Sequence, residues 1–115
     1  MELITKGETH FFEGVNIPNA GCIKGLPDEA IVEVPAVVGS FGFKGLNVGR
    51  LPRGIESILQ QRIAQQELTV EAALTGDRQL ALQALALDPM VPTIDIARKL
   101  LEDYIEAHKQ FLPQF

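Results

Sequence analysis

Alternation of apolar and polar residues predicts strands in the first half of the chain. In residues 30–38, AIVEVPAVV, every second residue from Ala30 is alanine or valine, which places these side chains on one face of a strand. Pro35 has no backbone N–H, so this strand is expected at a sheet edge or at a bulge. Gly39 and Ser40 would then turn the chain into a hairpin with residues 41–48 as its second arm. Residues 10–16 predict another strand, which Gly14 would weaken or mark with a bulge, and the Pro- and Gly-rich residues 17–28 predict a loop.

Helical spacing replaces this alternation after Pro52. Residues 52–75 predict a long helix that Gly76 ends, because glycine readily adopts the left-handed conformation of a helix C-cap. Asp77 would cap a helix over residues 78–87, and Thr93 would cap one over residues 94–110. The helix over 78–87 is apolar nearly all round, so burial on most sides is expected. The predicted fold class is α+β, with a small antiparallel strand or hairpin region over about residues 10–48 followed by three helices.

The size and charge of the chain narrow its functional class. Its 115 residues predict a single domain over residues 1–115. A net charge of −5 argues against general nucleic-acid binding and against docking on anionic lipid. The single cysteine allows no internal disulfide, which favours a reducing, cytoplasmic compartment. We expect no signal peptide and no membrane span, since neither an N-terminal apolar core nor a run of about 20 apolar residues is present.

Three local patterns suggest chemistry, and each has a simpler structural interpretation. Cys22, His10 and His108 are metal-ligand types, but the chain has no C-x-x-C or H-x-x-x-H spacing, so a loop cysteine and a helix-face histidine are favoured. The glycines in residues 39–45, GSFGFKG, do not match the spacing of a phosphate-binding loop, so a hairpin turn is favoured. Glu33 is a candidate acid or base, but no catalytic partner is evident, and an outward-facing carboxylate is the more common arrangement.

Polar residues interrupt the expected apolar face of the long helix. Residues Ile55, Ile58, Leu59, Ile63, Val70, Ala73 and Leu74 make up this face at 100° per residue. Arg62, Gln66 and Thr69 fall within it. A buried arginine needs an anionic or carbonyl partner, so the face would border a polar cleft or another subunit. Alternatively, the Arg62 side chain reaches the edge of the face and leaves its charged end in water.

Asn16 and Asn19 flank Ile17 and Pro18 in NIPN, at the start of the loop predicted for residues 17–28. An asparagine side chain offers donors and acceptors that suit sugar hydroxyl groups. It is equally suited to forming a turn with its own backbone, and on the residues alone the turn interpretation is favoured.

Two long segments resemble a known enzyme family. VNIPNAGCIKGLPDEAIVEVPAVV and GLNVGRLPRGIESILQQRIAQQELTVEAALTGDRQLALQALALDPMV are similar to the C-terminal region of the family 4 glycoside hydrolases, over about residues 16–108. That family includes α-glucosidases, α-galactosidases, α-galacturonidases and 6-phospho-glucosidases. Its members use NAD and a divalent metal, typically manganese. They remove a hydride from C3 of the sugar, eliminate the leaving group, add water and return the hydride.

The resemblance implies that residues 1–115 correspond to the C-terminal part of such an enzyme, without its N-terminal NAD-binding Rossmann domain. The family's Gly-rich NAD motif and its Gly-x-Cys-His metal motif are absent, and Cys22 lies in a different context, NAGCIKG. CIKGLP also departs from the more usual x-I-P-N-L-P pattern, which puts the loop contacts in doubt. This chain alone is therefore expected to bind neither NAD nor metal and to be inactive.

The resemblance also implies roles for particular residues and a mode of assembly. Asn16 and Asn19 would face a sugar or sugar-phosphate glycoside in the intact enzyme, and His10 would approach it. A surface that the NAD domain covers would be bare, so a homo-oligomer, a dimer or higher, is expected. The tail QFLPQF would contribute to it, or else fold back on the helices. The alternative function is a stand-alone, non-catalytic interaction module or truncated-gene remnant, which oligomerises or pairs with a separate NAD-binding chain.

Overall fold

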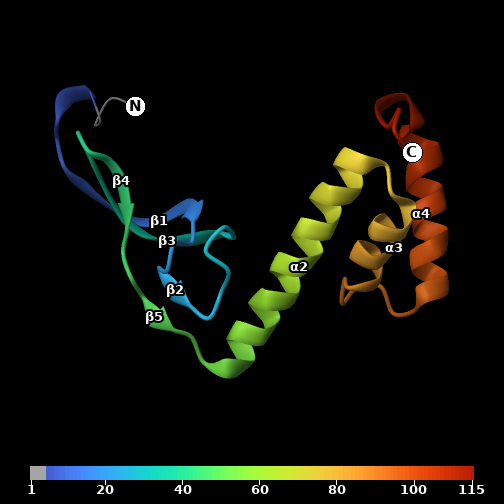
Figure 1. Ribbon diagram of the computed structural model, residues 1–115, viewed down its shortest axis with the longest axis horizontal. Coiled ribbons are helices and arrows are strands. Elements are labelled where there is room, and N and C mark those ends of the chain that lie inside the picture. Colours follow the sequence, from blue (N-terminus) through green and yellow to red (C-terminus); the bar gives the residue numbers. More distant parts are fainter. Residues whose placement is uncertain (1–4) are drawn as a thin grey trace. The chain divides into compact units, whose positions relative to one another are not determined.

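The computed structural model describes residues 5–115, which form two compact units. The strand unit extends to Ser57, and the helical unit runs from Ile58 to Phe115. Helix α2 (Arg53–Thr75) begins in the first unit and continues through the second (Figure 1). The predicted order of strands followed by three helices is confirmed, and the fold class is α+β. No helix within residues 5–115 has the length and apolar character that a membrane span requires.

The strand unit is built on a three-stranded antiparallel sheet. Its strands are β1 (His10–Pro18), β3 (Ile31–Gly39) and β4 (Gly42–Gly45), in the order β1-β3-β4. Residues 40 and 41 connect β3 to β4, so the predicted hairpin is confirmed. The predicted alternation also holds, because Val32, Val34 and Ala36 are buried whereas Ile31 and Glu33 are exposed.

Pro35 lies in the central strand and opposite a bulge, which is the second of its two predicted positions. The β1–β3 register shifts between the pairs Phe12–Ala36 and Val15–Val34, which leaves Glu13 and Gly14 opposite Pro35. On the other side of β3, the Leu46 N–H donates to the Pro35 carbonyl at 2.8 Å. The proline has no N–H to return a second bond, and the β3–β4 ladder ends there.

Two short strands, β2 (Ile23–Lys24) and β5 (Gly49–Arg50), form a parallel pair. Strand β2 lies within the segment predicted as a loop, and β5 lies beyond it. The loop prediction for residues 17–28 is therefore partly wrong, since β1 also extends to Pro18. This segment contributes much of the core of the strand unit, whose buried apolar residues are Ile17, Cys22, Ile23, Leu26, Ala30, Val32, Val34 and Ala36. Gly45 lies against this core, and a Cβ there would meet the side chains of Ile17, Cys22 and Val34.

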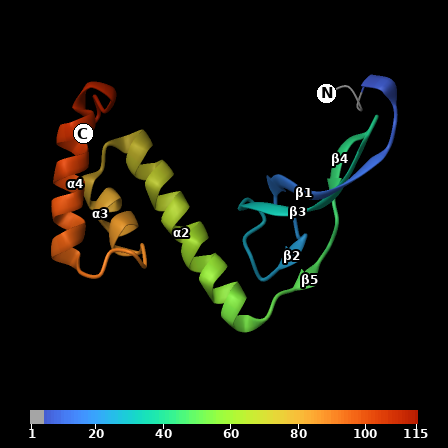
Figure 2. The same cartoon turned by 180° about the vertical axis from the view of Figure 1, so that it is seen from behind.

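The helical unit contains the rest of α2, then α3 (Arg78–Ala86), α4 (Ile94–His108) and the short 3-10 helix η1 (Lys109–Phe111). The helix ends follow the predicted caps. Asp77 accepts hydrogen bonds from the backbone of Gln79 and Leu80, and Thr93 accepts one from Ile96. Helices α3 and α4 run side by side, as both views of the chain show (Figures 1 and 2).

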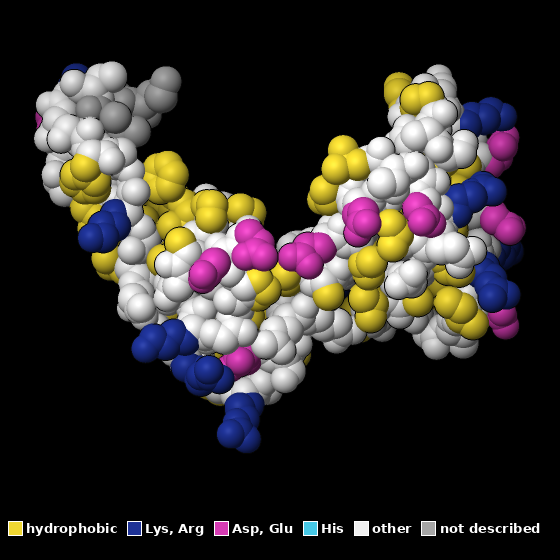
Figure 3. All heavy atoms as spheres, in the orientation of Figure 1, with side chains coloured by type: hydrophobic (Ala, Val, Ile, Leu, Met, Phe, Trp, Pro, Cys, Tyr) yellow, Lys and Arg dark blue, Asp and Glu magenta, His cyan; other side chains and the backbone are white. Residues whose placement is uncertain are grey.

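Burial in α3 is lower than its composition predicts. Ala84 is its one buried residue among those described, and Ala86 is exposed. The helix is nine residues long and carries several alanines. Their short side chains do not fill the space between α3 and the neighbouring helices. On the outer side of the unit, basic and acidic side chains alternate along α4 (Figure 3).

Candidate functional site

The two polar residues that we predicted on β1 face opposite sides of the sheet. His10 pairs with Val38, and Asn16 pairs with Glu33. Val38 shares the face of the buried Ala36 and Val34, whereas Glu33 lies on the other face, because strand side chains alternate. The two residues are six positions apart, roughly 20 Å at the usual rise of a strand. The structure therefore does not bring His10 and Asn16 into one site.

Asn16 and Glu33 form an exposed polar pair on one sheet face. Both side chains are exposed, and the two residues are direct cross-strand partners. The Glu33 carboxylate extends over the β1 bulge, since a Cβ placed on Gly14 would lie 2.8 Å from Glu33 Oε1. The outward orientation expected for Glu33 is thus observed. An amide beside a carboxylate offers donors and acceptors that match sugar hydroxyl groups.

His10 lies at the start of β1 and is exposed. Its Nε2 is 3.4 Å from Glu8 Oε2, in a pair that is open to solvent. Such an exposed pair contributes little to stability. Its side chain is thus left accessible from outside the strand unit.

Asn19 is fully buried, and its side chain organises the loop that follows β1. Its Nδ2 donates to the carbonyls of Ile23 and Leu26 at 3.0 Å each and of Pro27 at 3.1 Å. Its Oδ1 accepts a 2.7 Å bond from the Ile23 N–H. All of the side chain's donors and acceptors are therefore directed at its own loop, which fits the turn interpretation rather than a sugar contact.

The three metal-ligand residue types do not converge. Cys22 is buried beside Gly45, His10 is exposed on β1, and His108 is exposed at the end of α4. Within residues 5–115, no group of three His, Cys, Asp or Glu side chains is placed to hold a metal ion. The donor set of the described residues therefore does not fit the manganese that the family resemblance implies.

Arg62 is exposed and reaches an anionic partner at the edge of the helical unit. Its Nη1 donates to Gln65 Oε1 at 2.7 Å and lies 3.7 Å from Asp88 Oδ2. Gln65 Nε2 donates to the same Asp88 oxygen at 3.2 Å. The backbone N–H of Met90, then Gln65, and then the Arg62 charge hold the pKa of Asp88 below its ordinary value. The anionic partner agrees with the first sequence interpretation of Arg62, and the exposure of its side chain agrees with the second.

The covered face of α2 matches the predicted one only in part. Ile63 is buried as predicted, and Ala72 is the other buried residue of this helix. Gln66 is exposed, and so are Ile55, Ile58, Val70 and Leu74 of the predicted face. The apolar spacing predicted the helix correctly, but this spacing does not determine which side of α2 the neighbouring helices cover.

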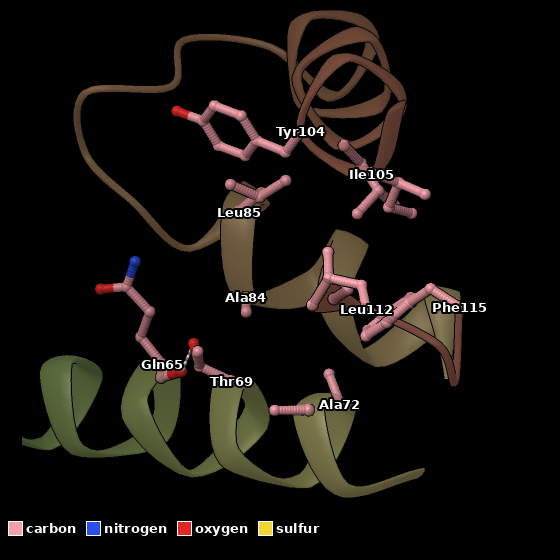
Figure 4. Close-up of a pocket in the computed structure, with 12 residues that line it drawn as sticks. Gln65, Thr69, Ala72, Ala84, Leu85, Tyr104, Ile105, Leu112 and Phe115 are labelled. Carbon is pink, nitrogen blue, oxygen red and sulfur yellow. Dashed lines mark hydrogen bonds between the residues drawn. The ribbon is translucent and has the colours of Figure 1, made fainter. Parts of the chain in front are cut away.

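A pocket in the helical unit was missed by the sequence reasoning. It has a volume of about 340 Å³ and opens between α2, α3, α4 and the C-terminal tail (Figure 4). Four alanines contribute to its lining: Ala72, Ala73, Ala81 and Ala84. Tyr104, Leu112 and Phe115 line it from α4 and the tail. The available sequence signal was the recurrence of alanine on α2 and α3, where larger side chains would have filled the space.

Known proteins match almost the whole chain. The family model described as the family 4 glycosyl hydrolase C-terminal domain matches residues 3–91. A probable 6-phospho-beta-glucosidase from Bacillus subtilis is 40% identical over 94% of this chain and 24% of its own length. A 6-phospho-alpha-glucosidase from gut microorganisms, solved in complex with NAD and glucose-6-phosphate, superposes with a TM-score of 0.92 at 35% identity. This match covers 99% of this chain and 26% of the solved one.

A second solved structure agrees. The 6-phospho-beta glucosidase from Thermotoga maritima, with manganese, NAD+ and glucose-6-phosphate, gives a TM-score of 0.86 at 31% identity, over 96% of this chain and 27% of that one. The chain thus spans about a quarter of the length of the relatives it matches. The agreement of the family model, the sequence relatives and the fold leads to one conclusion: the chain belongs to the family 4 glycosyl hydrolase C-terminal domains.

Proposed function

We propose that this chain supplies the C-terminal, substrate-side part of a family 4 glycosidase. The observation that supports this is the match of nearly the whole chain to about a quarter of NAD-containing 6-phospho-glucosidases. In this proposal, the NAD and the manganese are held by the other three quarters of a family-length protein. The cofactor supplies the hydride chemistry, and this chain supplies surface and orientation. The proposed compartment is the cytoplasm.

Asn16 is the residue on this chain that we propose faces the sugar or sugar phosphate. It is exposed, it is the cross-strand partner of Glu33, and its side chain is not directed into its own loop as that of Asn19 is. His10 would approach a substrate only from the opposite face of the sheet. We therefore place the sugar-facing polar pair at Asn16 and Glu33.

Fragment complementation tests the proposal. The purified chain is mixed with a Thermotoga maritima 6-phospho-beta glucosidase that lacks its C-terminal quarter, with NAD and manganese present. We expect turnover of a chromogenic 6-phospho-glucoside by the mixture and by neither protein alone. Asn16→Ala should raise KM or lower kcat of the mixture, whereas Glu102→Ala, an exposed change on α4, should alter neither. Turnover by the isolated chain would contradict the assignment of the chemistry to the remaining three quarters, and a mixture without activity would contradict the proposal itself.

Self-association is a separate part of the proposal. Four phenylalanines of the strand unit are exposed, Phe11, Phe12, Phe41 and Phe43. Apolar patches of this kind tend to be buried by association. We propose a dimer or higher homo-oligomer, and sedimentation velocity would show it as a mass above 12.6 kDa. A monomer across the accessible concentration range would refute it.

A further inference from the structure

The last four residues of the chain are held against the corner between α2 and α3. The Gln114 side chain donates from Nε2 to the carbonyl of Ala73, in the last turns of α2, at 2.8 Å. The Gln114 carbonyl lies against Gly76, the residue that ends α2. Leu112 and Phe115 line one side of the pocket (Figure 4). The tail thus folds back on the helices, which was one of the two arrangements expected for it.

The contact between the Gln114 carbonyl and residue 76 requires a glycine at that position. The φ of +73° at Gly76 is left-handed, a conformation that favours glycine, and the Gly76 N–H donates to the Ala72 carbonyl at 2.8 Å. A Cβ at this position would collide with the carbonyl of Gln114. Gly21, with a φ of +81°, has nothing within 4 Å of the position of a Cβ. The two glycines therefore share a backbone conformation but differ in what packs against them.

The attachment of the tail is weak. Among the described residues, one neutral hydrogen bond from Gln114 joins the tail to α2, and the apolar contacts come from Leu112 and Phe115, both half-buried. Local turns, Leu112 N–H to the Lys109 carbonyl at 3.3 Å and Phe115 N–H to the Leu112 carbonyl at 3.2 Å, shape the segment itself. Segments held by so few contacts open locally without unfolding of the whole structure.

We propose that the segment Leu112–Phe115 detaches reversibly from the helices. When it is attached, it packs against Gly76 and forms one wall of the pocket between α2, α3 and α4. In the closed state, Leu112 and Phe115 cover part of an apolar lining rich in alanine. In the open state that lining is exposed to solvent, and the helical unit otherwise keeps its fold. The device depends on the tail and on Gly76, and it is independent of the glycosidase assignment.

Hydrogen exchange by NMR measures the opening. Gln114→Ala removes one neutral hydrogen bond, which corresponds to about a fivefold higher ratio of open to closed tail. The amides of Leu112 and Phe115 should exchange faster by that factor. Gly76→Asn should remove their protection altogether, because asparagine tolerates the left-handed conformation but its side chain collides with Gln114. Gly21→Asn is the matched control and should leave exchange in the tail unchanged.

Ala73 provides an independent readout. Its carbonyl accepts the hydrogen bond from Gln114, and its side chain lines the pocket. The NMR chemical shift of its methyl group should change in Gly76→Asn and in a chain that ends at Phe111, while far-UV circular dichroism remains unchanged. Unaltered exchange at Leu112 and Phe115 in Gly76→Asn would overturn the proposal. So would the same Ala73 methyl shift in the full and the shortened chains. If Gly76→Asn fails to fold, Gln114→Ala and the shortened chain still decide the question.

Discussion

Replacing Asn19 with alanine should damage the strand unit far more than an ordinary surface change. The side chain is 0% exposed and makes four hydrogen bonds to its own loop. Its two Nδ2 hydrogens serve three carbonyls, so the set counts as about three full bonds. At about 1 kcal/mol net for each, the loss is about 3 kcal/mol, and it increases if the loop carbonyls remain buried without partners.

This magnitude is large compared with the stability available. Folding free energies are about 0.05–0.15 kcal/mol per residue, and the strand unit extends only to Ser57. We therefore expect the loop that follows β1 to open in Asn19→Ala, with loss of the bonds from Asn19 N–H to the Ala30 carbonyl and from Ala20 N–H to the Asp28 carbonyl. Asn19→Asp should be at least as harmful, because it removes both donors and points a carboxylate at carbonyl oxygens.

Urea unfolding followed by far-UV circular dichroism measures the effect, and Asn47→Ala is its matched control. The Asn47 side chain also makes two bonds to nearby backbone, to Gly21 O at 3.3 Å and from Gly49 N at 2.8 Å, but both are exposed. Exposed bonds are replaced by water, so this variant should lose about 0.5–1 kcal/mol. The reasoning is wrong if Asn19→Ala loses no more free energy of unfolding than Asn47→Ala does.

Three further changes have defined outcomes. Asp77→Ala removes the side chain that caps α3, and it should lower the free energy of unfolding by about 1 kcal/mol in a urea titration; an unchanged midpoint would contradict that role. Gly45→Ala places a methyl group against Ile17, Cys22 and Val34, and the overpacking should cost about 1–3 kcal/mol in the same assay, whereas Gly54→Ala, with open space around it, should not destabilise the protein. Because the folded protein lowers the pKa of Asp88, that carboxylate contributes stability above its ordinary pKa, about 3.9, and the contribution is lost as the pH falls through the lower folded value. Asp88→Asn should therefore flatten the acid side of the curve of Tm against pH. An unchanged curve would show that the contacts of the Asp88 carboxylate do not contribute to the stability of the folded protein.

Local features of the fold were predictable because their causes lie within a few residues. Asp77 and Thr93 cap helices through bonds to backbone two or three positions away. The bulge expected at Gly14 likewise follows from the flexibility of one glycine. Such signals are present in any short window of the sequence, whatever the remainder of the chain does.

The errors concern burial, which depends on distant segments. Pro35 was expected at an edge or at a bulge, and only the sheet register shows the bulge: its missing N–H falls where the β3–β4 ladder stops, and this allows it in a central strand. Asn19 resembled any turn asparagine in sequence, and only the return of residues 23–27 around it shows that it is fully enclosed. The α3 helix was expected to be buried, yet its alanines border a pocket, because helix spacing is set by the largest side chains in contact.

The register of the sheet also explains why a partner is expected for the strand unit. Phe12 and Phe43 share the face of Ala36, while Phe11 lies on the opposite face, so the hairpin end is apolar on both sides. The loop that follows β1 supplies core residues such as Ile23 and Leu26, but Phe11, Phe12 and Phe43 remain exposed. A small sheet with apolar side chains on both faces normally has both faces covered. The relatives are about four times as long as this chain, and we propose that the additional part of such a protein, or a second copy, covers these aromatic rings. In this proposal, complementation and self-association have one physical cause, because each association would bury the same exposed phenylalanines.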